Sequence, residues 1–361
     1  MKKAAILAGA RPQFIKAAAL YRALQPVCQP VLIHTGQHTG RQLSDDFFGE
    51  LQLPRPDWTL TPHGRTPEER LGGMIGQLMP VLQKEKPDCV LVIGDTDSTL
   101  AGALCAARGG FFLVHVEAGL RCGRTDMREE QNRVVADHLA QLLFCPTREA
   151  VEQATKEGLG EKAVYTGDLT VSCVAHAVRT LRETGKDQKI LTRYGVFPKK
   201  YLLFTMHRAE SEENHALSLF QAMEEVCRVP MPVLFPVHPR MQPYVKELKS
   251  RFDCRGIRFL PPVPYHTLLS LLVHARCCLT DSGTLQKESW LVQTPCITLR
   301  RETEWPQTLI GGWNQLCPPP FGKLAQRILT PVPERTRAKE FLSSDNVEER
   351  MANALQEALR V

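Results

Sequence analysis

The segment Phe111-Phe112-Leu113-Val114-His115-Val116-Glu117-Ala118-Gly119-Leu120 is a dense apolar run that ends on a single carboxylate, Glu117. A run this rich in phenylalanine, leucine and valine is typical of a strand buried on both faces of a parallel sheet. Such a strand tolerates a charge only where it leaves the sheet, and in open α/β sheets ligands bind at the carboxyl ends of the strands. The segment therefore predicts a parallel α/β fold with a polar site at the end of this strand.

The same pattern, an apolar strand followed by ionisable or polar residues, recurs in both halves of the chain. It occurs at 90–95, 202–207, 233–238 and 277–283. Because the strand ends of both halves carry polar groups, we expect two sheets that share one ligand-binding cleft.

Predicted strands and helices alternate throughout, which is the rhythm of βαβ units. With 361 residues the chain exceeds what one core usually encloses, so we expect two domains. A polar stretch at 182–189 predicts the boundary between an N-terminal Rossmann-like domain at 1–170 and a C-terminal one at 186–344. Apolar residues at i, i+4 spacing predict a last helix at 345–361, which we expect to pack back on the first domain.

The composition excludes several classes of protein. A hydrophobic content of 43% with 23% charged residues is ordinary for a globular protein, and a net charge of +6 fits an anionic small ligand better than a nucleic acid. The twelve cysteines show no zinc-ligand spacing, and several lie in apolar strands, so we expect free thiols in a reduced, cytoplasmic protein. No apolar segment is long enough to span a membrane.

Two glycine turns are candidates for binding phosphate. Gly9 to Lys16 joins a strand to a helix and carries Arg11 and Lys16, and a helix N-terminus favours anions. The segment from Asp281 to Glu288 repeats the arrangement, with Ser282 and Gly283 at the turn and Glu288 one turn into the helix. The alternative interpretation is a pair of ordinary turns with solvated charges, in which Glu288 is a surface carboxylate.

Carboxylates and histidines at other strand ends are candidates for acid–base chemistry. Asp95 belongs to a strand end, where helix capping does not explain it, and we expect it to converge with Glu117 and with one of Glu129 and Glu130. Carboxylates gathered at one edge can divide acid and base roles. His207 and His238 each precede an arginine closely, a pairing that favours phosphate contact or proton transfer.

Taken together and in order, these segments resemble the non-hydrolysing UDP-N-acetylglucosamine 2-epimerase family. The resemblance covers about residues 3–315 and rests on motifs at 9–16, 35–38, 94–99, 115–121, 129–133, 207–210 and 280–283. It implies two Rossmann-like domains in the glycosyltransferase-B arrangement, with a UDP-sugar bound between them, usually in a homodimer. It also implies a reaction in which UDP is eliminated across C1–C2 to give a glycal and is then added back with the opposite configuration at C2.

The resemblance further implies roles for individual residues, and it implies no cofactor, no metal, no nucleic-acid partner and no membrane partner. The expected catalytic residues are Asp95, Glu117, Glu129 and His207. The expected substrate-binding residues are Arg11, Lys16, Arg133, His238, Ser282, Gly283, Glu288 (at the ribose) and Arg300. Which carboxylate removes the C2 proton stays open.

Departures from the usual family motifs leave the substrate open as well. Arg128 replaces the usual proline, Thr284 replaces a glycine of the phosphate turn, and Arg301 replaces an aspartate. The segment 302–305 looks more like the branch that acts on UDP-2,3-diacetamido-2,3-dideoxyglucuronate, whose carboxylate extra arginines would suit. The other candidates are a glycosyltransferase on the same architecture, a hydrolysing epimerase and an inactive nucleotide-sugar sensor.

Gln37, His38 and His238 lie where some bacterial relatives bind a second nucleotide sugar. The arginine that often follows this Gln-His pair is Thr39 here, which weakens the case for a second site.

Overall fold

The computed structural model describes residues 1–37, 45–207, 212–303, 305–330 and 346–360. The chain divides into two compact units, Met1–Cys173 with Phe341–Val361 and Val174–Glu340. The division falls inside helix α7 (Leu169–Glu183), and the polar stretch at 182–189 holds the end of α7 and the start of α8 (Lys186–Tyr194).

The first unit is built on a parallel sheet whose described strands run in the order β3-β2-β1-β4-β5-β6-β7. The strands are β1 (Lys3–Ala8), β2 (Gln29–His34), β3 (Trp58–Thr59), β4 (Cys89–Ile93), β5 (Phe112–Val116), β6 (Leu142–Cys145) and β7 (Ala163–Tyr165). The order reverses between β1 and β4, and such a reversal is where doubly wound sheets bind ligands. The predicted parallel α/β fold is confirmed.

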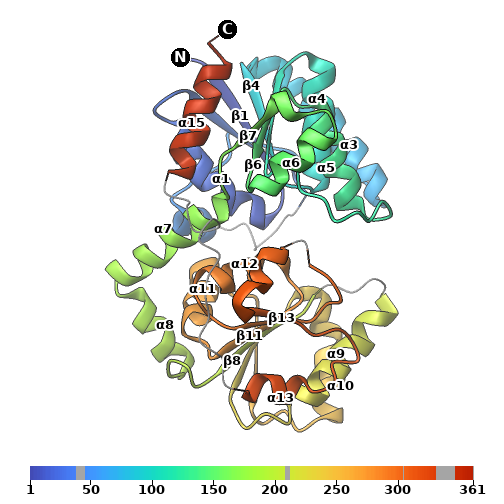
Figure 1. Cartoon of the computed structure of the whole chain (residues 1–361), viewed down its shortest axis with the longest axis vertical. Coiled ribbons are helices and arrows are strands. Elements are labelled where there is room, and N and C mark those ends of the chain that lie inside the picture. Colours follow the sequence, from blue (N-terminus) through green and yellow to red (C-terminus); the bar gives the residue numbers. More distant parts are fainter. Residues whose placement is uncertain (38–44, 208–211, 304, 331–345, 361) are drawn as a thin grey trace. The chain divides into compact units, whose positions relative to one another are not determined.

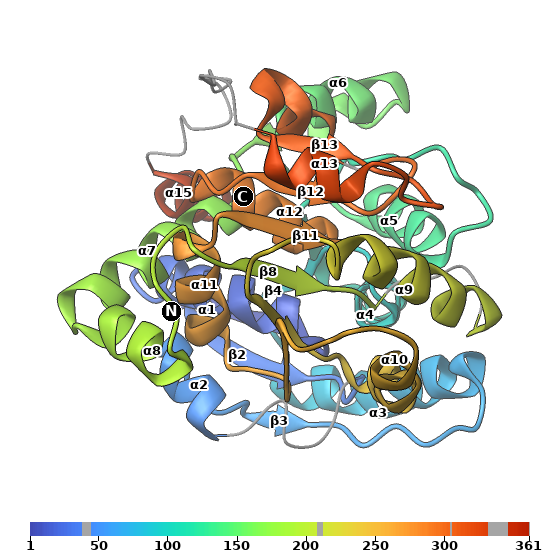
Figure 2. The ribbon, with the colours of Figure 1, turned by 90° about the horizontal axis from the view of Figure 1, so that it is seen from below.

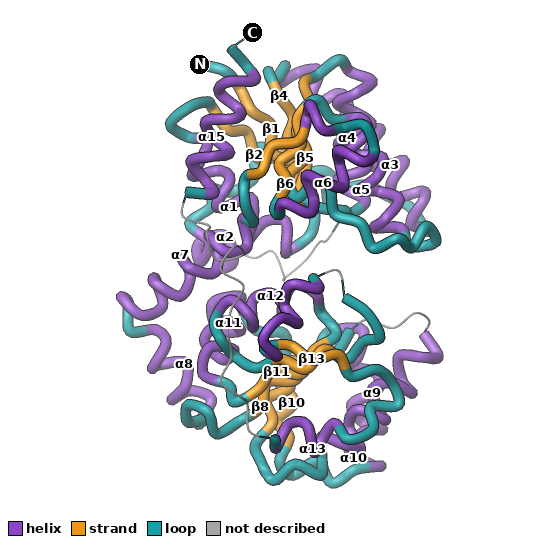
Figure 3. The backbone as a smooth tube through the Cα atoms, viewed as in Figure 1, coloured by secondary structure: helices purple, strands orange, loops and turns teal. Residues whose placement is uncertain are grey.

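Helices cover both faces of this sheet, as the orange strands between purple helices in Figure 3 show. The helices are α1 (Arg11–Leu24), α2 (Asp45–Leu51), α3 (Pro67–Glu85), α4 (Asp97–Gly109), α5 (Arg128–Leu139), α6 (Arg148–Lys156) and α15 (Val347–Ala358), with a 3-10 turn, η2 (Gly160–Lys162). Alternate strand residues such as Leu7, Val92 and Leu113 pack in one core with α3, α4 and α5. Residues of the opposite parity, such as Ile6 and Leu91, are just as buried, so the strands are covered on both sides.

The C-terminal helix α15 belongs to the first unit and lies beside α1 (Figure 1). It buries Val347, Met351 and Leu355. Glu348 accepts a hydrogen bond from Ser172 Oγ at 2.6 Å, which ties the helix to the start of α7. The last helix therefore closes over the same sheet that carries β1 and β5.

The second unit repeats the plan with the described strand order β10-β9-β8-β11-β12-β13, again all parallel. Its strands are β8 (Leu202–Thr205), β9 (Val233–Pro236), β10 (Ile257–Leu260), β11 (Cys277–Thr280), β12 (Cys296–Thr298) and β13 (Asn314–Leu316). Its helices after α7 and α8 are α9 (Glu212–Val226), α10 (Val245–Arg251), α11 (Tyr265–His274), α12 (Gly283–Leu291) and α13 (Leu324–Leu329), with 3-10 segments η3 (Pro239–Tyr244) and η4 (Pro306–Gly312). The order reverses between β8 and β11, which are neighbours in Figure 2.

The structure differs from the predicted elements in a few places, each with a physical reason. The strands β3, β7 and β13 have only two or three residues, too few to show a period. The segment before α10 forms the 3-10 helix η3 instead of an α-helix, because Pro243 inside it has no N–H to donate to the carbonyl four residues back. Among the described helices, none is both long enough and apolar enough to cross a membrane.

Candidate active site

The turn between β1 and α1 is fastened to the end of β4 by one buried side chain, Gln13. Its Oε1 accepts hydrogen bonds from the N–H groups of Gly9 (2.8 Å) and Ala10 (3.0 Å). Its Nε2 donates to the carbonyl of Ile93 at 2.8 Å and to Thr99 Oγ1 at 3.2 Å. The two strands at the reversal point of the sheet are therefore locked together, and α1 starts from a fixed place.

One turn further along α1, Lys16 forms an ion pair with Glu117 at the end of β5. The two side chains are only 14% and 10% exposed. Burial alone would lower the pKa of Lys16, but the charges of Glu117, Asp168 and Asp95 outweigh it, and the net pKa is raised. Both residues are predicted site residues, but their pairing is a finding of the structure.

Glu117 itself has an unusual backbone. Its φ is 71°, in the left-handed region that costs a residue with a Cβ about 1–3 kcal/mol. The carbonyl of Phe144 accepts hydrogen bonds from the N–H groups of both Glu117 and Ala118, each at 3.1 Å, and so stabilises the turn. Strain that the surroundings maintain is common at functional sites.

A small pocket opens beside this ion pair, within the first unit. Its lining residues are Lys16, Val116, Glu117, Pro146, Gly167, Asp168, Leu169 and Met351. Asp168, from the turn after β7, is buried, and its Oδ1 accepts a hydrogen bond from Thr170 N at 2.8 Å. No local sequence pattern marks Asp168 or Met351 as a site residue, because segments far apart in the chain bring them to this pocket.

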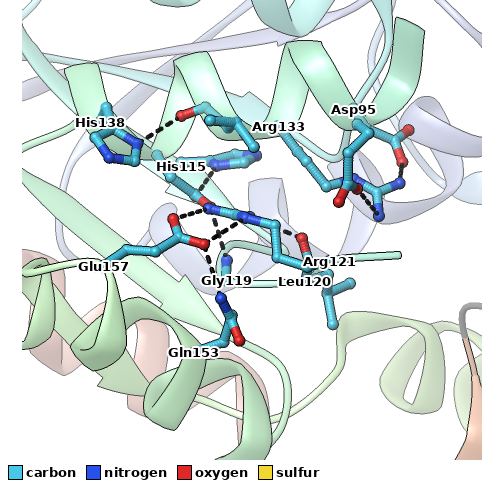
Figure 4. A network of polar contacts seen from close by, with 12 residues as sticks. Asp95, His115, Gly119, Leu120, Arg121, Arg133, His138, Gln153 and Glu157 are labelled. Carbon is cyan, nitrogen blue, oxygen red and sulfur yellow. Dashed lines mark hydrogen bonds and ion pairs between the residues drawn. The ribbon is translucent and has the colours of Figure 1, made fainter. Parts of the chain in front are cut away.

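A second ion pair joins Asp95, at the end of β4, to Arg133 on α5 (Figure 4). Arg133 is buried, and its Nη1 also lies 3.3 Å from Glu130 Oε2. Burial would lower the pKa of Arg133, whereas Asp95 and Glu130 raise it, with a net rise. Asn132 Nδ2 donates to the carbonyl of Asp95 at 3.0 Å and holds the turn in place.

The two glutamates that start α5 have different surroundings. Glu130 is buried, and its Oε1 accepts hydrogen bonds from the N–H groups of Cys122 (3.0 Å) and Gly123 (2.9 Å). Glu129 is half-buried. The sequence did not decide whether Glu129 or Glu130 would converge with Asp95. In the structure, Glu130 contacts Arg133, the ion-pair partner of Asp95. A catalytic role for Glu129 stays a prediction.

Behind these strand ends lies a buried network that the sequence did not indicate. His115 Nδ1 lies 2.6 Å from Asp137 Oδ1, and His115 Nε2 lies 2.7 Å from the carbonyl oxygen of Gly94. Asp137 Oδ2 accepts hydrogen bonds from Gly119 N (3.1 Å) and Arg121 Nη1 (2.7 Å). Burial would raise the pKa of Asp137, but His115 and Arg121 lower it, and the net pKa is lowered.

In the second unit, the ends of β8 and β9 bring two predicted site histidines together. The imidazole rings of His207 and His238 stack, with centroids 5.1 Å apart and an interplanar angle of 24°. Buried Asp281, after β11, accepts a hydrogen bond from His207 N at 2.8 Å and lies 3.4 Å from His207 Nδ1. The strand ends at the reversal point of this sheet are therefore coupled, as in the first unit.

The predicted phosphate turn in this unit is the start of α12. Ser282 is the N-cap, and its hydroxyl accepts a hydrogen bond from Leu285 N at 3.3 Å, with Gly283 as the first helical residue. Glu288 is buried, so it is not the surface carboxylate of the alternative interpretation. Arg300 is half-buried just after β12.

Some predicted features fall elsewhere. Arg128, considered for a carboxylated sugar, forms a surface pair with Glu68 at 3.0 Å, and both side chains are more than half exposed. His38, Thr39, Arg208 and Glu304 lie outside the described residues. Among the residues that the structure does describe, no group of three or more His, Cys, Asp or Glu side chains is placed to hold a metal ion.

Comparisons with known proteins agree with one another. A sequence model of the UDP-N-acetylglucosamine 2-epimerase family matches residues 22–356. A UDP-N-acetylglucosamine 2-epimerase homolog of Methanococcus maripaludis is 35% identical over 349 residues, 94% of each chain. The UDP-2,3-diacetamido-2,3-dideoxy-D-glucuronate 2-epimerase of Pseudomonas aeruginosa is 37% identical over 316 residues, 85% of this chain and 86% of the relative.

The solved structures give the same result. The UDP-GlcNAc 2-epimerase of Methanocaldococcus jannaschii, in complex with UDP-GlcNAc and UDP, superimposes with a TM-score of 0.87 and 34% identity, covering 99% of this chain and 100% of that one. With the family model, relatives above 30% identity and this fold in agreement, the chain belongs to the UDP-N-acetylglucosamine 2-epimerase family.

Proposed function

We propose that this protein interconverts UDP-N-acetylglucosamine and UDP-N-acetylmannosamine without hydrolysis. The observation that carries the proposal is a pair of strand-end carboxylates that each contact a cation, Glu117 with Lys16 and Asp95 with Arg133, in a member of this family. Elimination and re-addition of an anionic leaving group needs both kinds of side chain. The proposal also rests on relatives named as 2-epimerases.

The reaction is balanced within the substrate. A base takes the C2 proton, the C1=C2 double bond forms, and the C1–O bond breaks so that UDP leaves with the electron pair. Return of a proton to the other face of C2, with attack of a UDP oxygen on C1, gives the epimer. No net redox change occurs. The C2 proton is weakly acidic, so the base works best where water is excluded, and the departing phosphate needs cations or N–H donors where its charge develops.

By motif position, Asp95, Glu117, Glu129 and His207 form the proposed catalytic set. The proposed nucleotide-sugar ligands are Arg11, Lys16, Arg133, His238, Ser282, Gly283, Glu288 and Arg300. The strained backbone and low exposure of Glu117 support it as the first candidate for the C2 base. Asp95, Glu129 and His207 are the candidates for the opposite proton transfer.

The second candidate substrate is UDP-2,3-diacetamido-2,3-dideoxy-D-glucuronate, because the 37% identical relative is named as its 2-epimerase. The chemistry at C1 and C2 is the same, and only a C6 carboxylate is added. The surface pairing of Arg128 with Glu68 removes one of the arginines that favoured this substrate, and Arg301 is exposed.

The setting of the enzyme is part of the proposal. All twelve cysteines are free thiols, which supports a reducing compartment such as the cytoplasm. We propose that the protein works as a homodimer and supplies an activated amino sugar for polysaccharide assembly. Sedimentation of the purified protein at micromolar concentration tests the dimer directly.

The test of the reaction is C2 proton exchange in D2O, followed by NMR with each UDP-sugar alone. We expect deuterium at C2 and a new UDP-sugar, whereas free UDP with free sugar would replace the proposal by hydrolysis. Glu117→Gln should lower the exchange rate by about 10²–10⁴-fold. Glu68→Gln, at an exposed surface pair, is the matched control and should exchange as the wild type does.

A further inference from the structure

His115 is a histidine without solvent contact in the middle of the first unit. It lies on β5 and is 0% exposed, on the same face of the strand as Leu113, which packs against α5. Its ring spans two elements: Nδ1 meets Asp137 on α5 at 2.6 Å, and Nε2 meets the carbonyl oxygen of Gly94, after β4, at 2.7 Å. Figure 4 shows His115 in the same polar network as Gly119, Arg121 and Glu157.

Both partners of this ring can only accept hydrogen bonds. A backbone carbonyl has no proton to give. The carboxylate of Asp137 already accepts from Gly119 N at 3.1 Å and from Arg121 Nη1 at 2.7 Å, and both contacts favour its ionised form. A neutral imidazole has one donor and one acceptor nitrogen, so one of the two short contacts would set a lone pair against an oxygen. Only a ring that carries protons on both nitrogens satisfies both contacts.

The charges around the ring balance when it is an imidazolium. His115 and Arg121 then supply two positive charges, and Asp137 and Glu157 supply two negative ones, with Arg121 Nη2 lying 2.7 Å from Glu157 Oε2. The thiol of Cys145, on the neighbouring strand β6, contributes no charge because burial raises its pKa to about 12. Buried charges persist only when paired and hydrogen-bonded, and each member of this network meets that condition.

We infer that His115 is held as an imidazolium and that, with Asp137, it is a positioning device for the two proposed catalytic carboxylates. Through the Gly94 carbonyl it fixes the residue before Asp95, and through Asp137 and Gly119 N it fixes the turn after Glu117. The device rests on the proposed function, since it positions side chains that belong to the proposed reaction. Neither His115 nor Asp137 is a catalytic residue, because each acts through the backbone of another residue.

The device explains how two adjacent turns keep a constant separation. Gly94 and Glu117 both have positive φ, and Gly94 N donates to the carbonyl of Val116 at 2.9 Å. The left-handed backbone of Glu117 must be held by its surroundings, and His115 and Asp137 supply one anchor to each turn. A displacement of about 1 Å in a catalytic group can cost on the order of 10²-fold in rate.

The first experiment reads the protonation of the ring directly, in the wild-type protein. With ¹⁵N-labelled histidine, NMR detects a proton on a ring nitrogen by its one-bond coupling, and His115 is assigned from the backbone or by its loss in His115→Gln. We expect protons on both ring nitrogens at pH 7.5. Exposed His138, on the same helix as Asp137, is the internal comparison for the coupling measurement. A singly protonated His115 ring overturns the inference.

The second experiment tests positioning with His115→Gln and Asp137→Asn, and with His138→Gln as the matched control. For the first two variants we expect kcat for C2 exchange to fall on the order of 10²-fold with KM little changed, because binding groups stay while the carboxylates shift. The control should keep both parameters. A wild-type kcat in either folded variant overturns the inference.

The proposed reaction and the charge of His115 are tested independently. If the wild-type protein exchanges neither UDP-sugar, the proposed function is rejected while the NMR result still decides the charge of His115. If the wild type exchanges and the ring carries one proton, only the inference fails. Should His115→Gln not fold, Asp137→Asn and the wild-type spectrum decide the question.

Discussion

Replacing Lys16 by Met should destabilise the protein more than replacing its partner Glu117 by Gln. Removing one partner of a buried ion pair typically costs about 3–5 kcal/mol, since the other charge is left without compensation. The Lys16 and Glu117 side chains retain 14% and 10% exposure, which places the larger effect near the lower limit. The pair is not symmetrical, because a third charge, Asp168, acts on Lys16.

The asymmetry follows from what each variant leaves behind. Lys16→Met removes the cation that pairs with Glu117 and also lies near Asp168, and we expect a loss of about 3 kcal/mol in the free energy of unfolding. Glu117→Gln leaves Lys16 beside Asp168, so the loss should be about 1–2 kcal/mol. Asp95 does not alter the comparison, because Arg133 pairs with it in both variants.

Urea unfolding of the wild type, both single variants and the double variant measures these differences. The double variant should lose less than the sum of the single losses, with a coupling energy of about 1–3 kcal/mol. Equal losses for Lys16→Met and Glu117→Gln would refute the role given to Asp168. Additive losses would refute the ion pair itself.

Three further outcomes follow from local structure. Burial lowers the pKa of His266 to about 4, so below pH 6.5 the unfolded state binds a proton that the folded state does not. The free energy of unfolding should therefore fall by up to about 1.4 kcal/mol per pH unit between pH 6.5 and 4. In urea titrations, His266→Gln should show a smaller loss of stability over this pH range. A Cβ on Gly9 would lie 2.0 Å from a side-chain oxygen, so Gly9→Ala should lower the free energy of unfolding by about 1–3 kcal/mol, whereas Gly76→Ala in open helix should raise it by up to about 1 kcal/mol. Arg128→Gln should change stability by less than about 1 kcal/mol and leave the relative rates on the two UDP-sugars unchanged, because its partner Glu68 is on the surface.

Much of the candidate site could be predicted because a parallel sheet collects its strand ends at one edge. Glu117 and Asp95 were recognisable as charges that follow apolar strands, and Lys16 as a cation on the helix after the first strand. The strand order brings these strand ends near one another, with β1 and β5 on either side of β4. The sequence did not indicate which cation would meet which carboxylate.

The rest depends on contacts between segments far apart in the chain. Asp168 and Met351 reach the pocket from the β7–α7 turn and from α15, and no local pattern marks them. The sequence around Asp137 predicts an exposed residue on a charged helix face, whereas Asp137 is fully buried and contacts His115. Whether Glu129 or Glu130 faces Asp95 and Arg133 depends on how α5 is rotated about its axis. The sequence does not determine this rotation, because it does not locate the start of the helix to within one residue.

The Lys16–Glu117 pair also makes a prediction about ligand binding. If Lys16 holds the diphosphate of the substrate, it must give up part of its contact with Glu117, so the carboxylate competes with the ligand for one cation. Glu117→Gln removes that competition, and UDP alone should then bind about tenfold more tightly, about 1.4 kcal/mol. Calorimetric titration measures the change, and Glu68→Gln controls for the added net charge at an exposed site. Unchanged or weaker binding of UDP by Glu117→Gln would exclude Lys16 as a diphosphate ligand. If Glu68→Gln bound UDP more tightly by the same factor, the gain in affinity would come from the change in net charge and not from the Lys16–Glu117 pair. Tighter binding in Glu117→Gln alone would mean that the incoming phosphate itself releases Glu117 from its cation, which strengthens the carboxylate as a base at the moment when the sugar is in place.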